Sequence, residues 1–279
     1  MKDVIIDTLK DSVKLLPFLF IAFFLIELIE HRYNKKTKEF ITKSGKFGPL
    51  LGSLLGLFPQ CGFSVMATNL YTTRIITLGT LIAIYLSTSD EMLPIMLASN
   101  ASFTSILNIL LVKFVVGFIW GFVIDFIYRK KNNKPSYDIC EEEHCHCDEG
   151  IFFSALKHTL STTVYILIAT FLLNTVIYYV GEENISKVFM ENSIISFFAS
   201  SLIGLIPNCA ASIIITELYL AGAISFGCAV SGLLTGSGVA ILLLFKSNKN
   251  IKENLIILSL VYGIGVITGF IIEFVTKLV

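Results

Sequence analysis

Long apolar runs separated by short charged segments dominate the pattern of hydrophobic and polar positions along this chain. The runs cover Leu15–His31, Pro49–Tyr71, Ile75–Ala98, Phe103–Tyr128, Thr163–Val180, Ile194–Tyr219, Ala221–Phe245 and Leu255–Val275. A helix of about 20 apolar residues crosses the hydrocarbon core of a bilayer, so these runs predict membrane-embedded helices. Charged residues such as Glu27 close the first run and Arg32 follows it, with no small-residue cleavage site between them. We therefore interpret this run as a retained span. The pattern predicts an all-α polytopic membrane protein.

The chain contains an internal repeat. Leu55–Ser64 aligns with Ile203–Ser212, an offset of 148 residues (203 minus 55) that continues without a gap to Gly79 and Gly227. Similarity at a fixed offset indicates duplicated structural units. We therefore predict a first transmembrane repeat over residues 1–130, a connecting loop over residues 131–150 and a second transmembrane repeat over residues 151–279.

The positive charges of the loops predict how the repeats lie in the membrane. Lys and Arg concentrate on cytoplasmic loops. Here they follow the first, fourth and seventh runs, whereas acidic residues dominate the loop after the fifth run. The loop after the first run is therefore expected inside and its repeat counterpart outside. This assignment gives the two repeats the inverted topology of many secondary transporters and places the connecting loop in the cytoplasm.

One segment of each repeat is not expected to span the membrane. Lys46 is expected inside and Asn100 outside, yet two apolar runs lie between them where an odd number of crossings is needed. We favour the run at 49–71 as a re-entrant helical hairpin with its tip at Phe58–Gly62, because each arm has only about ten residues. The alternative is a hairpin over 75–98 folded at Ser87–Asp90. Each repeat is then expected to have three spanning helices plus one re-entrant hairpin, about ten segments in total, with broken helices at the midplane.

A Pro-amide-Cys motif interrupts an apolar run in each repeat. Proline removes a backbone donor and clashes with the preceding turn, and non-helical backbone at membrane depth is tolerated where it lines a polar cavity. We interpret the paired motifs as a substrate-binding site with amides, hydroxyls, freed helix N-termini and thiols that suit thiophilic metals or metalloids. Its expected residues are Pro59, Gln60, Cys61, Ser64, Pro207, Asn208, Cys209 and Ser212. Two proline kinks beside small, closely packed residues are the structural alternative.

A second break of consecutive polar residues interrupts the run at 75–98. Its hydroxyl residues and their repeat counterparts are expected to extend the substrate-binding site: Ser87, Thr88, Ser89, Thr235 and Ser237. Acidic residues inside a membrane usually mark ion or proton pathways, so Asp90 is predicted to be an ion ligand or proton carrier, with Glu91 beside it. Lys113, near the middle of the next run, is expected to pair with one of these acids and to be released when that acid is protonated. The structural alternatives are a helix end near the headgroups for Asp90 and a static ion pair for Lys113.

The connecting loop concentrates Cys and His residues in a short tract. They are Cys140, His144, Cys145, His146 and Cys147. Short Cys/His tracts bind zinc, copper and related ions, and this spacing is too tight for a zinc-finger fold. We predict a chelating cytoplasmic loop that loads or senses metal, so the expected metal ligands are these loop residues together with Cys61, Cys209 and Asp90. An acidic, solvated linker with incidental cysteines is the alternative.

Composition narrows the class of protein further. Hydrophobic residues make up 54% of the chain and charged residues 15%, against about a quarter charged in soluble domains. The formal net charge is +0, and no basic stripe indicates nucleic acid. No nucleotide-binding P-loop is present, so proton motive force is the expected drive. No His lies in a span near Cys61 or Ser64 to activate a nucleophile. A membrane enzyme is therefore disfavoured, and no cofactor is expected to be required.

Three segments carry a resemblance to a known family: residues 48–64, Leu86–Glu91 and the Cys/His-rich part of the connecting loop. They are similar to the ten-transmembrane heavy-metal exporters, whose members are labelled arsenic efflux proteins or manganese transporters. The Cys-bearing breaks also resemble those of organoarsenical permeases. The resemblance covers essentially the whole chain and implies export of a metal or metalloid. Arsenite would suit the thiols, whereas Mn²⁺ would prefer Asp90, Glu91 and carbonyl oxygens.

The internal repeat, the broken helices and the family resemblance together predict a secondary transporter in the cytoplasmic membrane. It is expected to export a heavy metal or metalloid by alternating access, with proton coupling through Asp90. The alternative is a transporter of an organic or inorganic anion held by opposed helix N-termini and Lys113, and a channel is a third, less favoured class. The expected partners are the lipid bilayer and a small inorganic substrate, with a second copy of the chain as a candidate and no nucleic acid.

Overall fold

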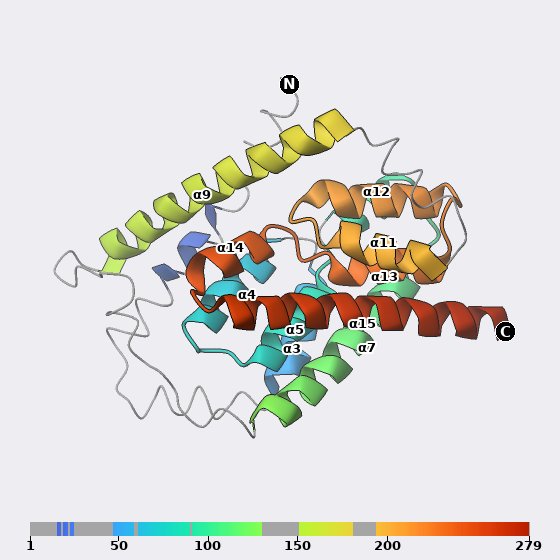
Figure 1. Ribbon diagram of the computed structural model, residues 1–279, viewed down its shortest axis with the longest axis horizontal. Helices are drawn as coiled ribbons and strands as arrows, with labels where there is room; N and C mark the ends of the chain where they lie inside the picture. Colours follow the sequence, from blue (N-terminus) through green and yellow to red (C-terminus); the bar gives the residue numbers. More distant parts are fainter. Residues whose placement is uncertain are drawn as a thin grey trace.

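Helices form all the regular structure of the residues that the computed structural model describes, which are 16–17, 19–21, 23–24, 47–58, 61–89, 91–129, 151–180 and 194–278 (Figure 1). The helices are α3 (Gly48–Gly56), α4 (Gly62–Thr72), α5 (Leu78–Ser87), α6 (Met92–Ala98), α7 (Phe103–Arg129), α9 (Ile151–Val180), α11 (Ile194–Gly204), α12 (Cys209–Leu220), α13 (Phe226–Thr235), α14 (Ala240–Ser247) and α15 (Ile251–Leu278). We refer to α3–α7 as the first half and to α11–α15 as the second half. The predicted all-α architecture is confirmed over these residues.

Five helical segments of the described residues are long and apolar enough to cross a membrane. They are Leu78–Ala98, Phe103–Tyr128, Ala155–Leu172, Phe226–Ser247 and Ile251–Leu278. The second of these segments has the bounds predicted for it. Helix α9 begins at Ile151, before the predicted start at Thr163, because the helix continues through polar residues that interrupt the apolar run. The number and length of these segments agree with a multi-pass membrane protein.

Four helices outside the five candidate spans are too short to cross a bilayer alone. Helices α3, α4, α11 and α12 have 9, 11, 11 and 12 residues. At a rise of about 1.5 Å per residue they reach only about half of a 30 Å hydrocarbon core. The connection between α3 and α4 coincides with the predicted hairpin tip at Phe58–Gly62.

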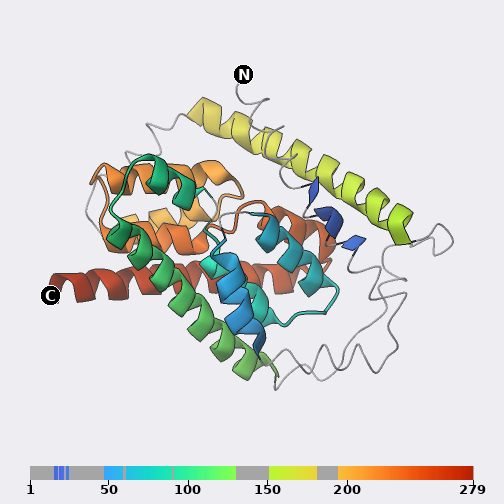
Figure 2. The same ribbon diagram turned by 180° about the vertical axis from the view of Figure 1, so that it is seen from behind.

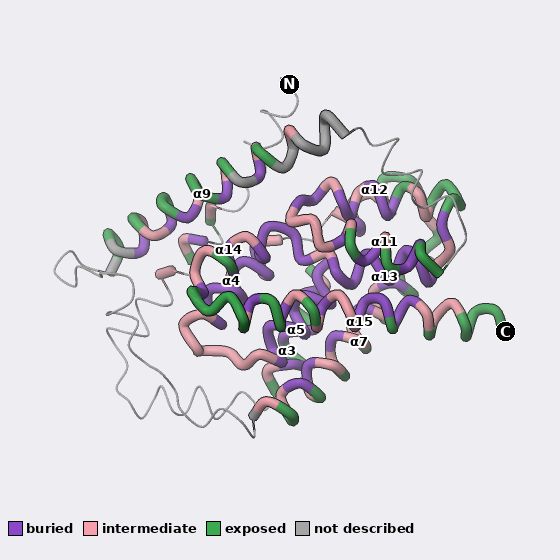
Figure 3. Tube along the Cα trace, viewed as in Figure 1, coloured by how far each residue is buried: buried purple, intermediate pink, exposed green. Residues whose placement is uncertain are grey.

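Two of the candidate spans are broken near their middle. Helix α5 ends at Ser87 and α6 begins at Met92, while α13 ends at Thr235 and α14 begins at Ala240. Both α5 and α13 are buried along almost their whole length (Figure 3). The breaks lie at the polar segments that the sequence alignment of the two repeats pairs with each other.

Each broken span packs against a long helix through glycines at equivalent positions. A Cβ atom on Gly121 of α7 would lie 2.8 Å from the carbonyl oxygen of Gly79 in α5. A Cβ atom on Gly269 of α15 would lie 2.8 Å from the carbonyl oxygen of Gly227 in α13. The two pairs are related by the repeat offset. Small residues let membrane helices approach closely, because packing rather than the hydrophobic effect drives helix association in lipid.

The two halves also contact each other at both ends of the helix bundle. Helix α4 packs against α14, and α12 packs against α6. Figures 1 and 2 place α11 and α12 at one end of the molecule and α4 and α14 at the other. Lys246, near the end of α14, also donates a hydrogen bond of 2.9 Å to Thr162 Oγ1 of α9 and lies over the ring of Tyr165.

Large apolar side chains are exposed on the outer faces of the long helices. On α7 and α15 they include Leu111, Ile119, Phe126, Ile267 and Phe274. Contiguous exposed apolar surface of this kind marks an interaction with a membrane or a partner. These faces suit contact with lipid tails, whereas the broken spans of α5 and α13 are buried in the protein interior.

Candidate functional site

The break between α13 and α14 lies in the interior of the protein. Ser237 is 0% exposed, and its Oγ has no hydrogen-bond partner among the described residues. Its carbonyl oxygen accepts a weak hydrogen bond of 3.4 Å from Ser64 Oγ, which comes from α4 in the first half. A buried polar atom without a partner is costly. The Ser237 hydroxyl is therefore available to a ligand that reaches this break.

The described residues of the Pro-amide-Cys motifs lie at the starts of two short helices. In the second motif the Asn208 side chain caps α12, because its Oδ1 accepts a hydrogen bond of 3.1 Å from the Ala210 N–H. In the first motif Cys61 directly precedes α4, whereas Pro59 and Gln60 lie outside the described residues. Helices α4 and α12 therefore begin at the two motifs, as expected from the proline in each motif.

The thiols and hydroxyls of the two motifs take equivalent positions. Ser64 Oγ donates to the Cys61 carbonyl oxygen at 2.7 Å, and Ser212 Oγ donates to the Cys209 carbonyl oxygen at 2.8 Å. Neither cysteine forms a disulfide within the described residues, and Cys61 is half-buried whereas Cys209 is buried. Each hydroxyl oxygen keeps lone pairs that can accept or coordinate. Each motif can thus offer one thiol and one hydroxyl oxygen to a ligand.

The hydroxyl groups at the break between α5 and α6 bond to backbone carbonyl oxygens. Ser87, Thr88 and Ser89 are buried and donate to carbonyls of their own segment at 2.7, 2.7 and 3.2 Å. Thr235, the counterpart of Ser87, donates to the Ser201 carbonyl oxygen of α11 at 2.9 Å. These bonds satisfy the hydroxyl protons and bring helices together, while the oxygen lone pairs stay available.

Lys113 is a buried cation that connects the two halves. It is 1% exposed in the middle of α7, and its ammonium group donates a hydrogen bond to the Leu233 carbonyl oxygen of α13. Of the two acids predicted to pair with it, Glu91 is half-buried just before α6 and Asp90 lies outside the described residues. The repeat counterpart of Lys113 is Val261, so this cation belongs to the first half alone.

Tyr85 is a core polar residue that sequence reasoning missed. It is 0% exposed in α5. Its hydroxyl lies 2.6 Å from Thr68 Oγ1 of α4 and 3.5 Å from the carbonyl oxygen of Ala240, the first residue of α14. The repeat counterpart of Tyr85 is Leu233. A comparison of counterpart positions for polar groups present in one half only would have identified this residue together with Lys113.

The predicted metal ligands are only partly covered by the structure. Cys140, His144, Cys145, His146, Cys147 and Asp90 lie outside the described residues. Within the described ranges, no group of three or more His, Cys, Asp or Glu side chains is close enough to hold a metal ion. The described groups at the breaks that could contact an ion are hydroxyl and carbonyl oxygens together with Cys61 and Cys209.

Comparison with known proteins identifies a family. The model of the family described as "Putative, 10TM heavy-metal exporter" matches residues 1–177 and 147–278. No curated protein and no solved structure matches the chain. The match extends over both halves and the segment that connects them.

Proposed function

Because this chain belongs to the family of ten-transmembrane heavy-metal exporters, we propose that it is a secondary transporter that moves a heavy metal or metalloid across the cytoplasmic membrane by alternating access. Membership of this family points to a multi-pass membrane transporter rather than an enzyme. The metal or metalloid is the substrate, and no further cofactor is required. Transport is directed outward and coupled to protons through Asp90.

The observation that carries the proposal is the buried break between α13 and α14. These helices have 10 and 8 residues, so each reaches about half of a 30 Å hydrocarbon core and the break lies near the midplane. There the unpartnered hydroxyl of Ser237 and the hydroxyl of Ser64 come from different halves. A site at the midplane between two repeats is the arrangement that alternating access requires.

Inverted repeats with re-entrant hairpins are supported by the packing of the short helices. The pairs α3–α4 and α11–α12 are too short to span, and each pair is followed by a broken span. Helix α4 contacts α14, whereas α12 contacts α6, as expected if one hairpin enters from each side of the membrane. The charge pattern then places the end with α4 and α14, and the connecting loop, in the cytoplasm.

The chemistry of the breaks favours a metal or metalloid over an anion. Thiols and hydroxyl oxygens are donors to cations and metalloids. An anion would use the N–H groups at the start of α12, but the Asn208 side chain already accepts from Ala210 N–H. The Lys113 ammonium likewise donates to the Leu233 carbonyl oxygen. Transport of an anion between opposed helix N-termini remains the second candidate function.

Thiol protection and vesicle transport test this function. Inverted and right-side-out vesicles would be assayed for uptake of arsenite, Mn²⁺, Cd²⁺ and organic anions, with Cys61→Ser and Asp90→Asn alongside. We expect metal or metalloid uptake that falls in both variants, and slower alkylation of Cys61 and Cys209 when the substrate is present. Cys228→Ser, which alters a buried thiol in the apolar cluster of α13, is the matched control. Uptake of anions only, or uptake unchanged by both site variants, would exclude the proposed site.

A further inference from the structure

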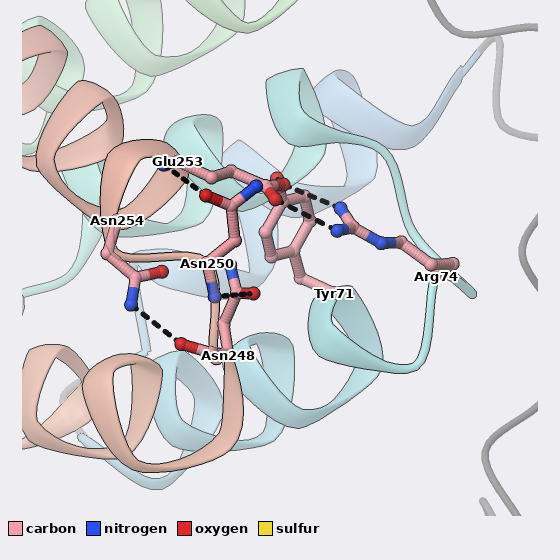
Figure 4. A network of polar contacts seen from close by, with 6 residues as sticks. All are labelled: Tyr71, Arg74, Asn248, Asn250, Glu253 and Asn254. Atoms are coloured by element: carbon pink, nitrogen blue, oxygen red, sulfur yellow. Dashed lines mark hydrogen bonds and ion pairs between the residues drawn. The ribbon is translucent and has the colours of Figure 1, made fainter. Parts of the chain in front are cut away.

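Arg74 and Glu253 form a bidentate ion pair that joins the two halves at one end of the bundle (Figure 4). Arg74 Nη1 donates to Glu253 Oε1 at 2.6 Å, and Nη2 donates to Oε2 at 2.9 Å. The Tyr71 hydroxyl donates to the same carboxylate, and the guanidinium lies 5.2 Å from the centre of the Tyr71 ring. Parallel charge-assisted hydrogen bonds are stronger and more directional than a single ion contact.

The two partners come from different halves of the chain. Arg74 follows α4 in the first half, and Glu253 lies in the first turn of α15 in the second half. The turn before α15 is held by Asn248, whose Oδ1 accepts from Asn250 N–H at 3.2 Å and whose carbonyl oxygen accepts from Asn254 Nδ2 at 2.9 Å. The side chains of Arg74 and Glu253 are 37% and 21% exposed, so the pair lies at the end of the bundle within reach of solvent.

Arg74 has an unfavourable backbone conformation. Its φ of 58° lies in the left-handed region, which a residue with a Cβ atom rarely adopts. Its repeat counterpart is Gly222, with a φ of 70°, where no such cost arises. Hydrogen bonds with Glu253 raise the pKa of Arg74, so the guanidinium stays charged. A strained residue held by its surroundings suggests a functional role for the side chain.

The opposite end of the bundle has no ion pair at the equivalent positions, which lie among the described residues. The counterparts of Arg74 and Glu253 are Gly222 and Ser105, which cannot form an ion pair. Tyr219, the counterpart of Tyr71, packs against the apolar cluster where α12 meets α6. The ion pair is therefore a feature of one end only, although the helices at both ends follow the same repeat.

We propose that Arg74, Glu253 and Tyr71 form an ionic latch that holds the α4–α15 end of the transport pathway closed. The latch rests on the proposed function, because it gates that same site. Helix α4 has 11 residues, so the latch lies about 16 Å from the turn at Cys61, roughly half a bilayer thickness. A gate on one side of a midplane site is expected at this depth. Opening this end moves α4 away from α15 and breaks the ion pair, whereas the other end opens by separating apolar surfaces.

The latch can be tested by the rate at which Cys61 reacts with a membrane-impermeant maleimide. Cys61 would be kept as the single cysteine, with the other five replaced by Ser, and the reagent added to one side of sealed vesicles at a time. Arg74→Gly removes the ion pair without strain, because Gly accepts the left-handed backbone. We expect about fivefold faster labelling from the latch side and no change from the other side. The reversed pair Arg74→Glu with Glu253→Arg is expected to label more slowly than Arg74→Glu alone.

The outcomes of this experiment distinguish a failure of the latch proposal from a failure of the proposed function. Unchanged labelling from the latch side in folded Arg74→Gly protein would overturn the latch, and so would an equal rise from both sides, which indicates general loosening. Ser105→Ala, at the equivalent position of the other end, is the matched control and is expected to leave labelling unchanged. One-sided gating in these vesicles, together with no metal transport by the protein that keeps all six cysteines, would reject the metal substrate and keep the latch. A Cys61 thiol that reacts from neither side in any variant would overturn both.

Discussion

The ammonium group of Lys113, buried in α7, donates a hydrogen bond to the carbonyl oxygen of Leu233 in α13. Leu233 lies two residues before the end of α13, so the bond ties the first half to the segment that leads into the candidate site. We expect Lys113→Met to lower the free energy of unfolding by about 1–3 kcal/mol, because a buried carbonyl loses a donor. Transport should fall more strongly, since the coupling of the halves is lost. Thermal unfolding in detergent and initial transport rates would measure the two effects.

Lys277 provides the control for this prediction. It is a 75% exposed lysine that pairs with Glu273 at 3.3 Å one helical turn away. Exposed pairs of this kind contribute little, so Lys277→Met should change stability by less than about 0.5 kcal/mol. Equal effects of the two substitutions would mean that the Lys113–Leu233 bond has no special role.

The glycine contacts between broken spans and long helices predict a second set of effects. Gly121→Ala places a Cβ atom 2.8 Å from the Gly79 carbonyl oxygen, and Gly269→Ala does the same against Gly227. In both variants the new Cβ atom is forced against a backbone carbonyl oxygen of the facing helix. Each substitution should therefore cost about 1–3 kcal/mol of stability. Gly263→Ala in α15 is the control, because nothing lies within 4 Å of the added atom. It should be neutral or stabilising by about 1 kcal/mol, as helix propensity favours Ala. A similar loss for all three variants in thermal unfolding would contradict this packing.

Local sequence pattern predicted the helical segments and the positions of their breaks. The run at Phe103–Tyr128 has the predicted bounds, and the polar segments after Ser87 and Thr235 interrupt the helices. Hydropathy determines these features, since backbone polar groups in lipid must be satisfied within a helix except beside a polar cavity. Ser64 and Ser212, which the repeat pairs with each other, make the same local hydrogen bond in the structure.

Contacts between the halves could not be predicted in the same way. The pattern of charges along the chain identifies Lys113 as unusual but does not say which carbonyl oxygen it contacts. Tyr85 was missed because an aromatic residue in an apolar run is counted as core, although its hydroxyl needs a partner when buried. Arg74 and Glu253 are 179 residues apart in sequence, and only the packing of α4 near α15 brings them together. The roles predicted for Pro59, Gln60, Asp90 and the connecting loop stay predictions, because these residues lie outside the described ranges.

The hydroxyl of Tyr85 links α5 to both α4 and the start of α14. Tyr85→Phe removes this link and leaves the ring in place, so we expect a stability loss of about 1 kcal/mol. The transport rate should fall as well, because α14 moves with the break that carries Ser237. Tyr262→Phe removes a hydroxyl that bonds to the Phe198 carbonyl oxygen at 3.4 Å in an exposed setting, and it should leave transport unchanged. A transport rate equal to that of the unsubstituted protein would show that the Tyr85 hydroxyl has no part in transport.

Substitutions at Ser237 and Ser231 can distinguish an effect on substrate binding from an effect on folding stability. The Ser237 hydroxyl has no partner among the described residues, so Ser237→Ala loses no hydrogen bond and should change stability by less than about 0.5 kcal/mol. If that hydroxyl binds substrate, the same change should raise the KM for transport about three- to tenfold, as expected for one lost hydrogen bond. Ser231 Oγ lies 2.6 Å from Ser201 Oγ and 2.9 Å from the Phe197 carbonyl oxygen. Ser231→Ala should therefore lower stability by about 1–3 kcal/mol and leave the KM of the folded protein unchanged. Reversal of this pattern, with KM affected at Ser231 and not at Ser237, would place the substrate away from the break between α13 and α14.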